Sequence, residues 1–237
     1  MKNIVANLVF FCAIVLSTSC GTGKAPETGT SEAAAQLQKD LKGTYEELFS
    51  EKTLLNPKWD AFWLSECEKA VGKDAAQATV DALKSSMTGT LTGEAATECF
   101  GDGSDGWRNG FQFNCDFKQG VSRFVFDGKG GIKGLDASGN EIFSHEYVFD
   151  SYNADYDFYF FKSKDGNEDE FSCFAMRSDT PASTHHLEFR YGTDVKSLSE
   201  FCTSKYAYWM AAGVLVESDS EQQESIRLFV EENTAGN

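Results

Sequence analysis

The chain has 237 residues, a formal net charge of −16 and an unusually large set of aromatic residues, 20 Phe, 8 Tyr and 4 Trp. The acidity and the lack of any basic cluster argue against a nucleic-acid partner, because nothing would neutralise the phosphates. The charge gives a mild attraction for cations without defining a site, and the aromatic content favours strands.

The first 20 residues have the pattern of an export signal. Lys2 gives a weakly positive start, and residues 4–16 form an apolar run too short to span a bilayer comfortably. Small residues then lead to Cys20, which resembles the lipidated cysteine of bacterial lipoproteins. Leu16 stands four residues before that cysteine rather than three, so a plain secretory signal is the alternative. Both interpretations predict export, and lipidation of Cys20 predicts a membrane-anchored lipoprotein of a bacterial cell envelope, periplasmic or exposed at the surface.

The next segments predict a tether and one large domain. Residues 21–36 are small and polar, as in a flexible tether. A single domain is expected over residues 37–217, and a helical hairpin within it over 57–87, divided by Gly72. The acidic residues 218–237 predict a final helix with a frayed end.

From about residue 109 the pattern changes to short strands between glycine and aspartate turns. Alternating apolar residues predict strands over 111–117, 121–126, 132–135, 141–149, 156–162, 170–176 and 185–191. A short helix is expected after Asp194, its N-cap. Six or seven short strands joined by tight turns predict an antiparallel meander, and hence a barrel or a sandwich with added helices.

Five cysteines remain once Cys12 and Cys20 are assigned to the signal. They are widely spaced and contain no CxxC pair, which argues against a zinc ribbon. An exported protein can form disulfides, but the odd number leaves at least one cysteine without an internal partner, and the pairing stays open. The five are Cys67, Cys99, Cys115, Cys173 and Cys202.

The clearest chemical pattern lies in the last predicted strand. His186 and Glu188 share one parity, and apolar residues alternate with them, so an imidazole and a carboxylate should lie on one face. Zinc accepts both kinds of ligand. Two ligands do not complete a site, and an ordinary solvated strand face is the alternative. His185 has the apolar parity and is the weaker candidate.

No motif for catalysis is visible, so we expect a protein that is not an enzyme. The sequence lacks a nucleophile elbow, a phosphate-binding loop and a metalloprotease helix. His145 lies in a predicted strand with aromatic neighbours on its own parity, as is typical of a half-buried histidine. It would complete a metal site if its strand faced His186 across the barrel.

The order of these parts resembles the ZinT family of exported zinc- and cadmium-binding proteins. Gly43 and Tyr45 open the similar region, and a helical insertion, a meander and a late strand with metal-ligand spacing follow. The late segment carries the best match, through Pro181, Ser183, Thr184, His186, Glu188, Phe189 and Gly192. The resemblance implies a calycin, lipocalin-like barrel that binds zinc, with cadmium as a surrogate. It also implies a monomer that exchanges its ion with an envelope transport protein.

The departures from the family concern the ligands themselves. Glu188 stands where the family has a second histidine, Arg177 falls near the position of an upstream histidine, and the mobile His-rich stretch is missing. A glutamate can replace a histidine as a ligand, whereas an arginine cannot bind a cation. Asp179 or His145 is then the candidate for the third ligand. The alternative is a barrel that has lost its metal and binds a small apolar ligand or a surface partner at an aromatic mouth.

Overall fold

The computed structural model describes residues 27–87, 117, 119–155, 157–166, 168–178, 186–201 and 211–234. The chain divides into a barrel unit, residues 23–57 and 114–225, and a helical unit that contains residues 58–113 and 226–237. The predicted helical hairpin belongs to the second of these units, together with residues 226–237. None of the described helices combines the length and the apolar character that crossing a membrane requires.

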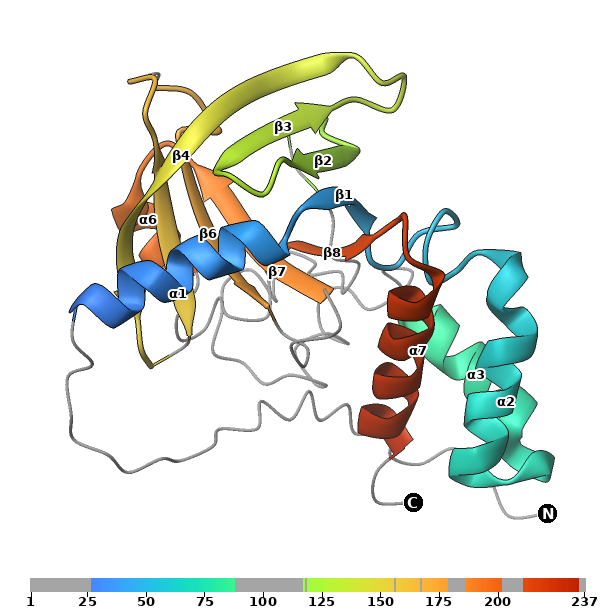
Figure 1. Ribbon diagram of the computed structural model, residues 1–237. Coiled ribbons are helices and arrows are strands. Elements are labelled where there is room, and N and C mark those ends of the chain that lie inside the picture. The colour runs from blue at the N-terminus through green and yellow to red at the C-terminus, as the bar shows by residue number, and fades with distance from the viewer. Residues whose placement is uncertain are drawn as a thin grey trace. The chain divides into compact units, whose positions relative to one another are not determined.

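Eight antiparallel strands close into a barrel in sequence order, because β8 pairs back onto β1 (Figure 1). The strands are β1 Gly43–Glu47, β2 Arg123–Phe126, β3 Gly131–Leu135, β4 Glu141–Asn153, β5 Phe158–Ser163, β6 Cys173–Ser178, β7 His186–Gly192 and β8 Ala211–Leu215. The predicted fold class, an antiparallel calycin-like barrel with helices, is confirmed. The strand expected over 111–117 falls outside the described residues except for Phe117.

Aromatic rings fill the interior of the barrel. Phe124 of β2 is fully buried, and its ring centroid lies 4.9 Å from that of Phe189 and 5.0 Å from that of Phe117. The other buried aromatic residues of this cluster are Tyr45, Phe126, Phe143, Tyr147, Phe161, Phe171, Phe174 and Tyr191. Small barrels are commonly filled by side chains in this way. Many of the aromatic residues of the chain therefore form the core of the barrel.

A helix, α1 Glu27–Asp40, occupies residues for which a flexible tether was expected. Its sequence is rich in alanine, which favours helix, and Ala34 is fully buried while Leu37 packs against the barrel cluster. Gln38 also donates a hydrogen bond of 3.4 Å to the carbonyl oxygen of Tyr147 on β4. Two apolar contacts and one polar contact therefore dock a segment whose overall polarity resembles that of a linker.

The predicted helices of the second unit are present. A short 3-10 turn, η1 Pro57–Trp59, leads into α2 Asp60–Val71, and α3 Lys73–Met87 follows after Gly72, whose φ of 82° favours glycine. Trp63 of α2 is fully buried against Phe229, with 6.2 Å between ring centroids. Phe229 belongs to the C-terminal helix α7 Asp219–Thr234, which the acidic tail predicted.

The helix expected after Asp194 is α6 Val195–Phe201. Asp194 caps it as predicted, because its Oδ1 accepts a 2.9 Å hydrogen bond from the backbone N–H of Ser197. Leu198 of this helix packs in an apolar cluster with Phe160 and Cys173 on the outer face of the barrel. The helix therefore covers part of the outward surface of β5 and β6.

Two of the five predicted mature cysteines lie in the described residues, and both are buried free thiols. Cys67 lies on α2 and Cys173 on β6. Burial, with a smaller contribution from the Glu66 carboxylate, raises the pKa of Cys67 to about 11. Burial also raises the pKa of the Cys173 thiol. A thiol with a raised pKa is a poor nucleophile at neutral pH, so neither cysteine suggests a reactive centre.

Candidate functional site

The polar face of β7 carries the predicted pair of metal ligands. His186 and Glu188 are half-buried, whereas Leu187, Phe189 and Tyr191 point into the barrel cluster. The alternation expected from the sequence is therefore present, and the two candidate ligands lie on the outward side of the barrel wall. On β8 they lie opposite Val214 and Ala212, whose side chains have no polar groups.

The Glu188 carboxylate is held by Arg177 of the neighbouring strand β6. The two residues are directly opposite in the strand register. Both Nε and Nη2 of Arg177 approach the same oxygen, Oε2 of Glu188, at 2.7 and 2.5 Å. Both side chains are largely shielded, with 16% and 19% of their surface exposed. The guanidinium also lies over the ring of Phe158, 5.0 Å from its centroid. Arg177 therefore places a positive charge directly beside Glu188.

His145 lies on the other side of the barrel wall from His186. It belongs to β4, where it shares the inward parity of Phe143 and Tyr147 and is itself buried. The structure does not bring it to the β7 pair, because His145 has the inward parity of its strand and His186 has the outward parity of β7. The expectation that His145 could complete the site with His186 is corrected on this ground.

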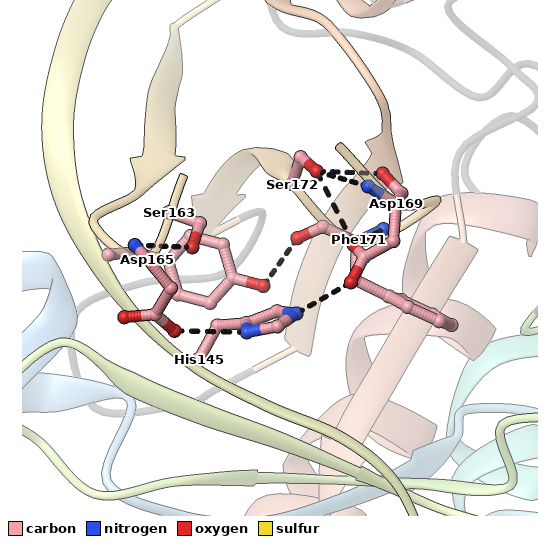
Figure 2. Close-up of polar contacts among 7 residues, drawn as sticks. His145, Ser163, Asp165, Asp169, Phe171 and Ser172 are labelled. Atoms are coloured by element: carbon pink, nitrogen blue, oxygen red, sulfur yellow. Dashed lines mark hydrogen bonds and ion pairs between the residues drawn. The ribbon is translucent and has the colours of Figure 1, made fainter. Parts of the chain in front are cut away.

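Two aspartates of the β5–β6 loop bracket the His145 ring instead, as Figure 2 shows. Nδ1 lies 3.0 Å from Oδ2 of Asp165, and Nε2 lies 2.9 Å from Oδ2 of Asp169. Each ring nitrogen therefore has one carboxylate oxygen as its partner. The ring cannot chelate one ion together with both carboxylates, because its nitrogens point in opposite directions. The arrangement serves to tie the loop to β4.

Backbone contacts complete this loop anchor. Oδ1 of Asp169 accepts a 2.8 Å hydrogen bond from the N–H of Phe171, and the hydroxyl of Tyr147 donates one of 2.5 Å to the Phe171 carbonyl. The ring of Phe171 stacks on that of Phe143, with 4.1 Å between centroids. The loop is therefore held both by hydrogen bonds and by the aromatic core.

We expect Asp169→Asn to weaken the acid sensitivity of folding. Burial raises the pKa of the Asp169 carboxyl, but the Phe171 N–H and the contacts with His145 outweigh it, and the pKa lies below its ordinary value of 3.8. A lowered folded-state pKa contributes stability above the unfolded-state pKa, and this stability is lost as the pH falls through the folded-state pKa. Wild type should therefore lose more stability than Asp169→Asn when denaturant unfolding is repeated from about pH 5 down to pH 2.

The matched control is Asp155→Asn in an exposed turn, which should keep the pH dependence of wild type. If Asp169→Asn and Asp155→Asn followed the same curve, the role of Asp169 would be refuted.

The described residues supply two metal donors rather than a complete site. No group of three or more His, Cys, Asp or Glu side chains that could hold a metal ion occurs within them. Asp179, the other candidate for the third ligand, lies outside the described residues and directly follows the last residue of β6 in the sequence. Cys20 and His185 are outside them as well.

Comparison with known proteins finds similarity only at the level of structure. No protein-family model and no curated protein matches the chain. The chain resembles a ZinT-like domain. The Zn(II)-bound ZinT-like domain of Streptococcus pneumoniae AdcA is 11% identical, with a TM-score of 0.44, and the match covers 81% of this chain and 89% of that domain. Zn(II)-bound AdcA from the same organism is 10% identical with a TM-score of 0.41. That match covers 87% of this chain and 40% of AdcA, so the chain spans less than half of AdcA.

Proposed function

We propose that this chain is a binding protein for a divalent metal ion, zinc in the first place with cadmium as a surrogate, and not an enzyme. The observation that carries the proposal is the pair of unlike donors, His186 and Glu188, on one half-buried face of a regular strand. Both AdcA structures are zinc-bound, but it is His186 and Glu188 of this chain that support the proposal.

The donor set fits zinc in kind and is incomplete in number. Zinc binds imidazole nitrogen and carboxylate oxygen at roughly 2.0–2.2 Å, usually with three protein ligands where one position stays open. His186 and Glu188 would supply two of these ligands, and Asp179 is the candidate for the third. An open fourth position allows the ion to be received and handed over, which suits a carrier better than a structural site.

The proposal includes a location at the cell envelope. The positive start, the apolar run of residues 4–16 and Cys20 support export and a lipid anchor. A monomer held near the membrane could pass its ion to an envelope transport protein.

Calorimetric titration with zinc tests the proposed function. Wild type should bind one zinc ion, and His186→Ala and Glu188→Ala should each weaken binding strongly, since a site with few protein ligands cannot spare one. His185→Ala is the matched control and should bind as wild type does, because in the sequence His185 has the parity of the apolar residues and is the weaker candidate.

Two results would reject the proposal: no zinc binding by wild type, or unchanged binding by the His186→Ala, Glu188→Ala double variant.

A further inference from the structure

We propose that Arg177 is an internal competitor of the metal ion, so that zinc binds Glu188 only when the guanidinium has moved away. This inference rests on the proposed function and concerns the strength and control of binding at the same site. Arg177 is a positioning and affinity-setting residue here, and it is not a ligand.

The first ground is that the ion and the guanidinium would share one carboxylate. Nε and Nη2 of Arg177 both contact Oε2 of Glu188. A zinc ion would have to approach this carboxylate to roughly 2 Å. With the guanidinium in place, two positive charges would stand within a few ångströms of each other, in partly shielded surroundings that screen them poorly. Binding of the ion and the Arg177–Glu188 contact are therefore mutually antagonistic.

The second ground is that the competing contact is not an ordinary surface ion pair. Pairs exposed to water contribute little because solvent and salt screen them. Arg177 and Glu188 are more than four-fifths covered, and the strand register places them face to face. Charge-assisted hydrogen bonds in such surroundings are the stronger kind. Zinc binding must therefore overcome the free energy of the Arg177–Glu188 contact.

Phe158 gives the displaced guanidinium a place to stay. Its ring, in the outward apolar cluster of β5, already lies 5.0 Å below the Arg177 guanidinium carbon. A cation–π contact of this kind can persist while the carboxylate contact is broken. Arg177 can then leave Glu188 without moving fully into water, which makes exchange between the closed and the metal-bound arrangement accessible.

The consequence is an apparent zinc affinity lower than the ligands alone would give, because Glu188 is free for the ion only in the fraction of molecules with the open arrangement. At low free zinc the Arg177–Glu188 pair keeps the carboxylate occupied, and at higher free zinc the ion replaces the guanidinium. Such a site releases its ion readily, because the displaced arginine competes to return.

Competition titration of zinc against a chromophoric chelator, at one pH and one salt concentration, tests the inference. Arg177→Met removes the charge and keeps the length of the side chain, and we expect zinc affinity to rise on the order of tenfold to a hundredfold, the range that one charge-assisted contact spans. Arg177→Gln should show the same direction and guards against a folding defect in the first variant. The control is Lys162→Met on β5, which removes the ion-pair partner of Asp150 on β4. It should leave zinc affinity unchanged.

The outcomes separate the two proposals. If wild type binds zinc and neither Arg177 variant binds it more tightly, the competition is refuted while the proposed function stands. If neither wild type nor the two Arg177 variants bind zinc, the proposed function and this inference fail together.

Discussion

Phe124→Ala should lower the free energy of unfolding by about 3–5 kcal/mol, the usual cost of removing a buried aromatic ring. The ring is fully buried and contacts rings from several strands, so the barrel cannot close over the space without moving many neighbours. Its partners are Phe117, Phe143, Phe174, Phe189 and Tyr191. Denaturant unfolding followed by near-UV circular dichroism measures the loss.

The control for Phe124 is Val148→Thr, at a strand position that is 44% exposed. It should change stability by no more than about 0.5 kcal/mol. A loss below about 1 kcal/mol for Phe124→Ala would contradict an aromatic interior packed at native density.

Gly134→Ala should cost about 1–3 kcal/mol, because it adds a methyl group where the core has no space. A Cβ atom at this position of β3 would lie 2.6 Å from Cδ1 of Phe143 and nearer still to Cε1. Phe143 cannot easily rotate away, since its ring is stacked on Phe171 and faces Phe124. Thermal and denaturant unfolding of the variant measure the effect.

Gly192→Ala is the matched control for this glycine. It also lies in a strand, but its added Cβ would meet the side chain of Leu198 at an ordinary 3.5 Å. The two variants should therefore differ clearly in stability. Equal losses would show that the close approach of Phe143 to β3 is not the cause.

The barrel could be predicted where side chains alternate, and its closing strands could not. β7 alternates strictly between polar and apolar residues, and the structure keeps that parity. β8 consists of Ala-Ala-Gly-Val-Leu, with four of its five residues buried, so no period of two marks it as a strand. β1 has five residues and follows α1 almost directly, and its role depends on pairing with β8.

Helix α1 could not be predicted either, because its composition indicates a tether. Residues 27–36 have the small, polar and weakly hydrophobic residues that are typical of a linker. Their helix is stabilised by tertiary contacts of Ala34 and Leu37 with the barrel, which composition alone does not reveal.

The candidate site divides in the same way between local and tertiary information. The shared face of His186 and Glu188 follows from spacing within one strand, so the sequence predicts it. The contact of Arg177 with Glu188 follows from the register between β6 and β7, and the sequence showed only that an arginine stands near a histidine position of the ZinT family. Register is set by the pairing of whole strands, which spacing within one strand does not contain.

The surroundings of His145 were likewise beyond local reasoning. Its strand was predictable from its aromatic neighbours, whereas the structure buries it more fully than the half-buried position expected. Asp165 and Asp169 belong to a segment whose sequence indicates a turn. That both carboxylates reach back to one imidazole depends on how the β5–β6 loop folds over β4.

Zinc-edge anomalous diffraction from crystals of the protein soaked in zinc would locate the bound ion. We expect an anomalous peak at roughly 2.0–2.2 Å from a ring nitrogen of His186 and a carboxylate oxygen of Glu188, with the Arg177 guanidinium withdrawn from that carboxylate. An intact Arg177–Glu188 pair with no zinc beside it in the soaked crystal would contradict this expectation.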